Sequence, residues 1–285
     1  LWALLLSALS VSALAIYQKI TGQFIFNEFW ANAENRRVVS WFGYPNAIGL
    51  YLAPLLLLFT GWFFSLPHIT TISKTLKKLL IILVSVCSLL AIYFARSEGA
   101  LIGIVAGLFA FSLLAGKKQR LVILSLSAIV IFGVFFFAPT KNFVSTKLKL
   151  QDLSGQIRQR QWKETFMTLQ GIKFFTGNGL NNYQTAVAPY HQEGIFFNSD
   201  NLSNFDEQLR ASSTLREKYW QPVEIYMYPH NIFLNFWSEI GLGGAIVFMW
   251  LLFKAGLMSL KLTITYGKEN HSEKYLALGL LCALV

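Results

Sequence analysis

Long apolar runs alternate with short polar stretches along this chain. Most of the runs are about as long as the hydrocarbon core of a bilayer requires. We predict membrane-spanning helices at Leu1–Tyr17, Tyr44–Leu66, Leu79–Ala95, Gly99–Gly116, Leu121–Ala138, Asn231–Phe253 and Tyr275–Val285. Because no Met opens the chain and apolar runs lie at both ends, we expect it to be an excerpt of a longer protein. The predicted fold class is an all-α polytopic membrane protein, a transmembrane helix bundle.

One polar stretch is much longer than the others and divides the chain into three predicted parts. Residues 1–138 hold about five spans, the first of them truncated. Residues 139–229 form a large loop, and residues 230–285 hold two more spans, the second truncated. A loop of this length is usually functional or disordered. Its aromatic residues, among them Trp162 and Trp220, favour a folded and mainly helical loop.

Two helices are predicted inside this loop. The first begins at Ser154, whose hydroxyl can cap it, and has a broken apolar stripe that includes Trp162. At 100° per residue, Arg158 shares the packed side with Trp162, whereas Arg160 points to the opposite, solvated side. The alternative for Arg158 is a purely structural one, with its stem lying over the Trp162 ring. The second helix is predicted over residues 206–218.

Composition and charge agree with a membrane protein. The chain is 54% hydrophobic and only 13% charged, which excludes an ordinary soluble domain. Its net charge of +10 would suit a nucleic-acid partner, but the basic residues gather in alternate connections, as expected of cytoplasmic loops. The large loop is then extracytoplasmic. These basic residues are Lys74, Lys77, Lys78, Lys117, Lys118, Arg120, Lys254, Lys261, Lys268 and Lys274.

His230 is the first candidate for chemistry. It lies where the polar loop runs back into the apolar segment 231–253, so its imidazole can meet both water and a lipid-borne substrate. Ionisable groups at membrane depth are costly and therefore point to function. The alternative is an interfacial residue that anchors the end of a helix, in an aromatic belt with Tyr226 and Tyr228.

The apolar segment after His230 carries a polar stripe. Asn231, Asn235 and Ser238 share one helix face, and Glu239 follows directly. Hydrogen bonding between helices is the alternative use of such a stripe, but it leaves the carboxylate of Glu239 without an explanation. The glycines that follow are interpreted as sites of close helix packing; they are Gly241, Gly243 and Gly244.

Two further polar groups are predicted at the same membrane level as His230. Arg96 lies at the outer end of one span and Asn46 near the start of another. For Arg96 the structural alternative is a local pair with Glu98. Arginine binds phosphate through two parallel hydrogen bonds, and histidine can act as a general base near neutral pH. The extracytoplasmic side has neither paired carboxylates nor a His/Cys cluster, which disfavours metal-dependent chemistry; we predict neither a metal nor a cofactor.

These residues, taken in order, resemble the O-antigen ligase and polymerase superfamily. Residues 228–244 resemble its His-Asn…Glu-x-Gly motif, with His230, Asn231, Glu239 and Gly241. Residues 158–162 resemble its Arg-x-x-x-Trp element, residues 177–183 its Gly-x-Gly turn, residues 97–100 its Ser-Arg-Gly-Ala element, and residues 44–46 an upstream element. One position departs from the pattern: Glu98 stands where the family has arginine, and Arg96 lies two residues earlier.

The resemblance implies a metal-independent glycosyltransferase in the inner (plasma) membrane of a bacterium. Such an enzyme moves a glycan from undecaprenyl diphosphate to a hydroxyl of lipid A-core, a growing polysaccharide or another acceptor. Within that expectation, His230 is the general base, and Arg158 and Arg96 hold the diphosphate. Asn231 and Glu239 orient the imidazole or line the pocket, and Arg160 and Asn46 are further substrate-binding candidates.

Two other functions remain open on the sequence. A lipid-linked glycan transporter or flippase would perform no chemistry, and it would be expected to show an internal repeat and discontinuous helices. A structural or receptor-like subunit would leave Glu239 unexplained. The sequence does not separate ligase from polymerase, because both share these motifs.

Overall fold

A computed structural model describes residues 1–34, 36–66, 72–137, 149–266 and 271–284. It is 73% helical with almost no strand, which agrees with the predicted all-α class. The chain divides into two compact units, one of residues 1–138 with 254–285 and one of residues 139–253. The second boundary falls inside the long helix α13 (Ile232–Tyr266). Predicted positions 67–71, 138–148, 267–270 and 285, Lys268 included, lie outside the described residues.

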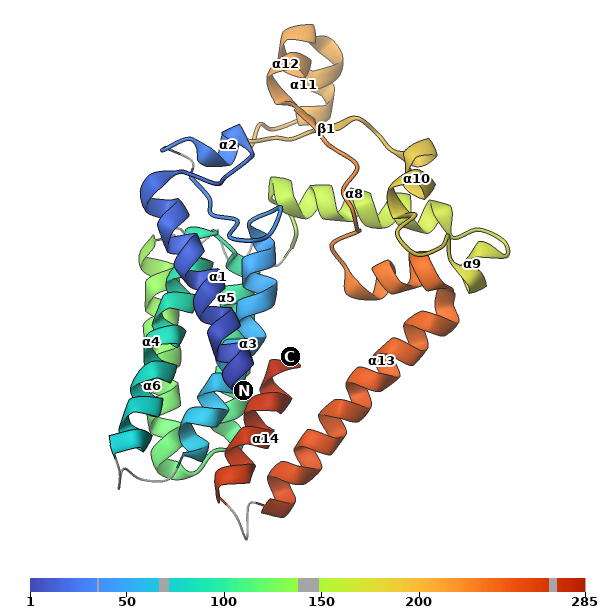
Figure 1. The fold of residues 1–285 in the computed structure, drawn as a ribbon. Helices are drawn as coiled ribbons and strands as arrows, with labels where there is room; N and C mark the ends of the chain where they lie inside the picture. Colours follow the sequence, from blue (N-terminus) through green and yellow to red (C-terminus); the bar gives the residue numbers. More distant parts are fainter. Residues whose placement is uncertain (35, 67–71, 138–148, 267–270, 285) are drawn as a thin grey trace. The chain divides into compact units, whose positions relative to one another are not determined.

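The first unit is a helix bundle (Figure 1). Its helices are α1 (Trp2–Thr21), the short α2 (Glu28–Ala31), α3 (Asn46–Ser65), α4 (Ile72–Phe94), α5 (Glu98–Leu114), α6 (Lys117–Phe137) and α14 (His271–Ala283). Helix α3 lies at the centre, since it packs against α1, α4, α5 and α14. The core formed there includes Phe59, Phe111 and Leu278, all with exposed fractions of zero. Both cysteines are free, and Cys282 is part of this core.

Four helices of the described chain are long and apolar enough to cross a membrane: α1, α3, α4 and α13. Helix α5 is apolar but shorter. Helices of this number, length and composition make this a multi-pass membrane protein. The bounds differ from prediction where basic residues are concerned. Helices hold all the described ones: Lys74, Lys77 and Lys78 lie on α4, Lys117, Lys118 and Arg120 on α6, Lys254 and Lys261 on α13, and Lys274 on α14. A long aliphatic stem lets such a side chain reach water from a helix. The prediction that they occupy loops was wrong.

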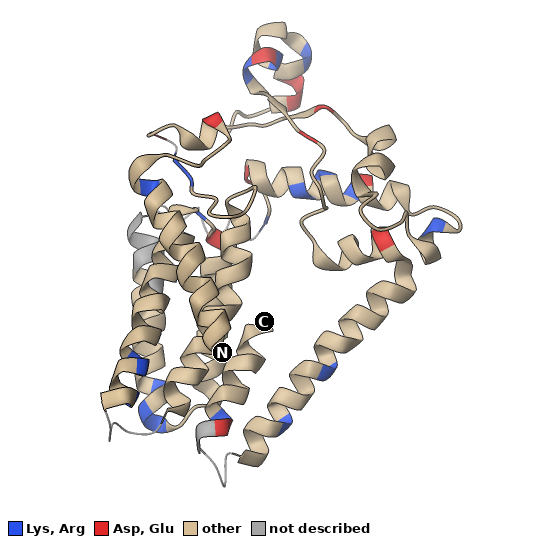
Figure 2. Ribbon diagram, in the orientation of Figure 1, with Lys and Arg blue, Asp and Glu red and all other residues tan. Residues whose placement is uncertain are grey.

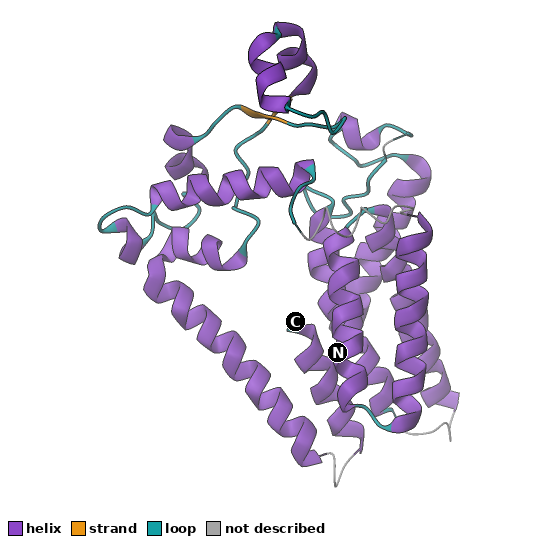
Figure 3. Ribbon diagram, turned by 180° about the vertical axis from the view of Figure 1, so that it is seen from behind, coloured by secondary structure: helices purple, strands orange, loops and turns teal. Residues whose placement is uncertain are grey.

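The second unit is built on α8 (Leu153–Thr168) (Figures 1 and 3). After it come the short helices α9 (Lys173–Thr176) and α10 (Tyr183–Val187) and the 3₁₀ turn η1 (Ala188–Tyr190). Strands β1 (Gly194–Phe196) and β2 (Trp220–Pro222) pair antiparallel, with Ile195 opposite Gln221. Helices α11 (Phe205–Ala211) and α12 (Ser213–Tyr219) connect the two strands. The unit ends with the first part of α13.

Two local predictions in this unit were wrong. Helix α8 is capped by Asp152, whose Oδ1 accepts from the Gly155 amide at 3.3 Å, and Ser154 lies within the helix. The helix expected over residues 206–218 is broken at Ser212, which has an extended backbone with φ −134°. There the serine hydroxyl accepts from the Leu215 amide and starts a new helix, a use of serine that competes with helix continuation.

Candidate active site

His230 lies in the second unit, immediately before α13, in a left-handed backbone conformation with φ 50°. Such a conformation costs a non-glycine residue on the order of 1–3 kcal/mol and persists only where neighbours hold it. Two neighbours do so here. The indole nitrogen of Trp162 on α8 donates to the Pro229 carbonyl at 2.9 Å, and Asn231 Oδ1 accepts from the Leu234 amide at 3.1 Å, capping the helix. Both sides of His230 are therefore fixed.

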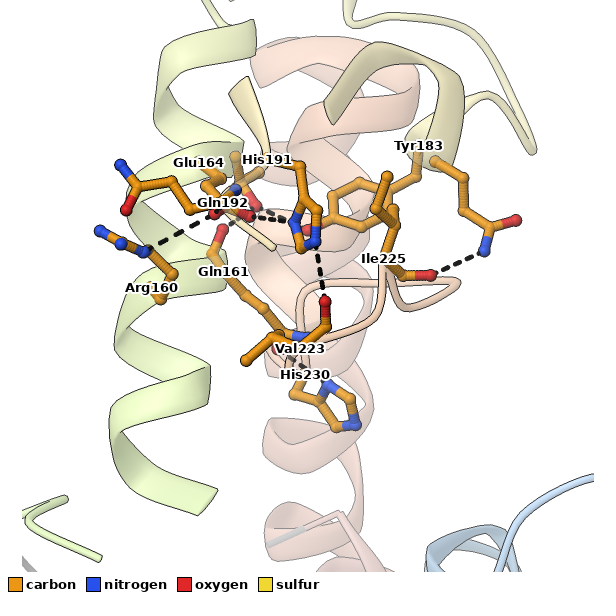
Figure 4. A network of polar contacts seen from close by, with 11 residues as sticks. Arg160, Gln161, Glu164, Tyr183, His191, Gln192, Val223, Ile225 and His230 are labelled. Carbon is orange, nitrogen blue, oxygen red and sulfur yellow. Dashed lines mark hydrogen bonds and ion pairs between the residues drawn. The ribbon is translucent and has the colours of Figure 1, made fainter. Parts of the chain in front are cut away.

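The imidazole itself is held by Gln161 of α8 (Figure 4). Its Nδ1 lies 3.0 Å from the side-chain carbonyl oxygen Oε1 of Gln161. An oxygen acceptor at that distance requires the proton on Nδ1, which leaves the lone pair of a neutral ring on Nε2. The rings of Tyr226 and Tyr228 pack on the imidazole at centroid distances of 5.1 and 4.9 Å. His230 is thus an oriented neutral base whose Nε2 has no hydrogen-bond partner among the described residues.

Arg158 lies within electrostatic reach of this imidazole. Burial lowers the pKa of His230 below its usual value, and repulsion from the Arg158 guanidinium acts in the same direction. The imidazole is therefore predominantly neutral at pH 7. Arg158 Nε and Gln161 Nε2 are both buried donors without a hydrogen-bond partner in the structure. An unsatisfied buried donor costs about 1–3 kcal/mol, so two of them close to a histidine mark a place for an acceptor-rich ligand.

Arg160 differs from its predicted solvated position. Its side chain is only 24% exposed, and its Nε lies 3.8 Å from Oε1 of Glu164, which is 4% exposed. The buried face of α8 consists largely of polar residues, including Gln161, Glu164 and Thr165, whereas Phe166 is 50% exposed. The predicted apolar stripe was therefore wrong. The helix packs against loop backbone that offers amides and carbonyls, so polar side chains satisfy it better than apolar ones.

Glu164 anchors the rest of the unit to α8 (Figure 4). Its carboxylate accepts from the Gln192 amide at 3.1 Å and lies 3.2 Å from His191 Nδ1, while His191 Nε2 lies 2.9 Å from the Val223 carbonyl. Both ring nitrogens of His191 are thus within hydrogen-bonding distance of oxygen atoms, one on Glu164 and one on Val223. Residues next to both strands are thereby tied to the helix that bears Gln161.

Tyr183 adds a second tie to the same helix. Its hydroxyl lies 3.0 Å from Thr165 Oγ1, and burial raises the pKa of Tyr183 to about 12. The hydrogen bond with Thr165 lowers this pKa and the nearby Glu164 raises it. The phenol thus stays protonated and structural. This network positions α8 rather than taking part in chemistry.

Helix α13 is interrupted at Gly241, which has φ 76° and ψ 175°. The turn Gly177–Gly179 fills the interruption: the Asn178 amide donates to the Ser238 carbonyl at 2.7 Å and the Gly179 amide to the Glu239 carbonyl at 2.9 Å. A Cβ on Gly241 would lie 1.9 Å from the Phe175 carbonyl oxygen, so only glycine fits. The Gly-x-Gly turn and the Glu-x-Gly element, separate in sequence, form one contact.

This contact corrects the interpretation of the glycines as sites of helix packing. Gly241 accommodates the α9 turn, an added Cβ on Gly243 would meet nothing within 4 Å, and one on Gly244 would meet only Ile240 of its own helix. Glu239 takes part through its backbone carbonyl, and its side chain is half-buried. Asn231 acts as a helix cap, so orientation of the imidazole falls to Gln161.

The first unit holds the two other predicted residues. Arg96 is exposed between α4 and α5, and Asn46 is the first residue of α3. Arg37, which the sequence analysis missed, joins them: its guanidinium donates to the Ala95 carbonyl at 3.0 Å and to Asn46 Oδ1 at 3.2 Å. Burial lowers the pKa of Arg37, and repulsion from Arg96 lowers it further, whereas Glu98 raises it. Basic residues of this unit lie mainly near the helix ends (Figure 2).

Gln161 was also missed. A signal for it existed in the sequence, because residues three apart are neighbours on a helix and Gln161 is three residues after Arg158. A glutamine directly after Arg160 nevertheless looks like part of a solvated face.

Fold and site together define a helical membrane protein with a histidine-centred polar site next to the start of a spanning helix. A family model described as O-antigen ligase matches residues 83–249, more than half of the chain. The chain belongs to this family. The family supports a ligase- or polymerase-type function in polysaccharide biosynthesis, with lipid-linked glycan and polysaccharide as general partners. No curated protein and no solved structure matches the chain significantly.

Proposed function

We propose that this protein is a metal-independent glycosyltransferase that moves a glycan from undecaprenyl diphosphate to an acceptor hydroxyl. The observation that carries the proposal is the arrangement of His230, with Nδ1 held by Gln161 Oε1, Nε2 free and Arg158 nearby. A neutral imidazole with an available lone pair on Nε2 can accept the proton of an acceptor hydroxyl, as a general base must. A guanidinium stays positively charged and can donate two parallel hydrogen bonds to the oxygens of a diphosphate.

The proposed reaction is a single displacement. The acceptor oxygen attacks the anomeric carbon of the donor glycan, and His230 Nε2 takes the hydroxyl proton. The bond between the anomeric carbon and the diphosphate oxygen breaks, and its electron pair leaves with undecaprenyl diphosphate. Arg158 stabilises the charge that develops on this leaving group. Its Nε, buried without a partner, is one of the donors available for the task.

From the resemblance, Arg96 is proposed to take the role of the family arginine that is Glu98 here. Arg37 lies next to Asn46 in the same unit as Arg96. Arg160 is proposed to act indirectly, by pairing with Glu164. The large loop is proposed to be extracytoplasmic and the membrane to be the bacterial inner membrane, because basic residues mark the other ends of the helices.

A transporter of lipid-linked glycans is the second candidate, and the interruption of α13 at Gly241 is the observation in its favour. In transporters, carbonyls freed at such interruptions coordinate the cargo. Here the carbonyls of Ser238 and Glu239 accept from Asn178 and Gly179, so the chain itself occupies them. This favours the transferase.

The test is a reaction with purified full-length protein in detergent. Undecaprenyl-diphosphate glycan and candidate hydroxyl acceptors are supplied, and released undecaprenyl diphosphate is measured with and without EDTA. We expect release that depends on the acceptor and is unchanged by EDTA. Movement of intact donor across proteoliposomes without any release would favour the transporter instead.

A further inference from the structure

The segment from Leu169 to Leu180, which contains α9, presents an apolar surface that the proposed reaction does not use. The side chains of Ile172, Phe175 and Leu180 are 73%, 65% and 75% exposed. Large apolar side chains that gather on a surface usually mark contact with another apolar phase. The contacts of the segment with α13 indicate that this phase is lipid.

The segment from Leu169 to Leu180 is attached to α13 by hydrogen bonds and a ring contact. Trp237 of α13 donates from its indole nitrogen to the Phe174 carbonyl at 2.8 Å, and the rings of Phe174 and Trp237 meet edge to face at 5.0 Å. The Asn178 and Gly179 amides bind the carbonyls of Ser238 and Glu239. The apolar segment is therefore fixed to residues 237–241 of a helix that is long and apolar enough to span a membrane.

The depth of this attachment follows from the length of α13. A hydrocarbon core about 30 Å thick takes about 20 helical residues. If Lys261 marks one edge of the core, the other edge falls near Gly241, where the helix is interrupted. The segment is bonded to Ser238 and Glu239, directly before this interruption, and therefore lies near the membrane boundary.

The backbone of the segment is also suited to a medium without water. Every amide from Lys173 to Gly179 donates a hydrogen bond, either to a carbonyl of the same segment or to Ser238 and Glu239. Irregular backbone at membrane depth requires such pairing, because lipid offers no partners. Lys173, the charged residue of the segment, is exposed and has a stem long enough to reach the headgroups.

We propose that the segment from Leu169 to Leu180 inserts Ile172, Phe175 and Leu180 among lipid acyl chains. Exposed apolar side chains then continue from α13, where Val247 is 56% and Phe253 65% exposed, onto this segment. The insertion fixes α8, and with it Gln161 and Arg158, at the level of the lipid headgroups. The proposal does not depend on the reaction assigned to His230.

The test is nitroxide accessibility in the full-length protein, reconstituted in phosphatidylethanolamine–phosphatidylglycerol vesicles. Spin labels are placed at Phe175→Cys, at Ile172→Cys and, as the control, at exposed Glu217→Cys on α12, with Cys87→Ser and Cys282→Ala as background. Relaxation by oxygen, which partitions into lipid, is compared with relaxation by a water-soluble nickel chelate. We expect oxygen to dominate at 172 and 175 and the chelate to dominate at 217.

Two results would overturn the proposal. Chelate dominance at both 172 and 175 would show that water covers the segment. Low accessibility to both reagents at both positions would show that protein covers it. Because the two side chains are highly exposed, labelling either one should leave the fold intact, and agreement between them excludes a local artefact.

Discussion

The hydrogen bond between Gln161 and His230 makes a prediction about the pH profile of the enzyme. In Gln161→Glu a carboxylate replaces the amide carbonyl that accepts from Nδ1. A net hydrogen bond between neutral groups contributes about 0.5–1.5 kcal/mol, and one to a charged group about 1.5–3 kcal/mol. The difference, roughly 1 kcal/mol, favours the imidazolium and corresponds to a rise of about one unit in the pKa of His230.

The sign follows from the role of the neutral ring. In the wild type, burial and Arg158 lower the pKa of His230, so the rising limb of kcat/KM should reach half-maximum below pH 6.5. In Gln161→Glu this limb should move upward by about one unit. The carboxylate can also pair with Arg158 and reduce the maximal rate, so each profile is normalised to its own maximum.

The assay measures undecaprenyl diphosphate release from pH 5 to 9 for the wild type, Gln161→Glu and Gln159→Glu. Gln159 is exposed on the same helix, which makes its variant a matched control for added charge. The Gln159→Glu profile should superimpose on that of the wild type. An unmoved Gln161→Glu profile, or equal shifts in both variants, would refute the assignment of Gln161 as the residue that positions the imidazole.

Two further predictions concern Arg158 and Gly241. Arg158→Lys should lower kcat/KM about 10- to 100-fold, because lysine keeps the charge but loses the planar pair of donors; Arg160→Lys, which retains the single pair with Glu164, should lose less, and a larger loss there would reverse the two roles. Gly241→Ala should cost about 3 kcal/mol or more in thermal unfolding, whereas Gly243→Ala should be neutral, and equal melting temperatures would contradict the α9 contact.

Local pattern was sufficient for most of the helices and for part of the site. The apolar runs predicted α1, α3, α4 and α5 to within a few residues at most ends, because bilayer thickness fixes the length of a span. The offset of Arg158 from Trp162 identified a helix that does bring Arg158 near His230. These features depend on residues close together in sequence.

The features that were missed depend on contacts distant in sequence. The interruption of α13 at Gly241 is imposed by the Phe175 carbonyl, and the apolar run around it gave no sign of a break. The position of Arg160 follows from Glu164, which is itself buried by residues near 191 and 223. Arg37 and Gln161 are ordinary surface residue types, and only the fold shows that their side chains reach Asn46 and His230.

The most direct test of the account is turnover per correctly inserted molecule in His230→Ala. Inserted protein is quantified by fluorescence size-exclusion after extraction, and the rate of undecaprenyl diphosphate release is divided by this amount. Donor binding is measured separately on the same sample. Loss of a general base lowers a rate by about two to four orders of magnitude, so we expect such a loss with folding and donor binding retained. Near-normal turnover per inserted molecule would contradict the catalytic role of His230.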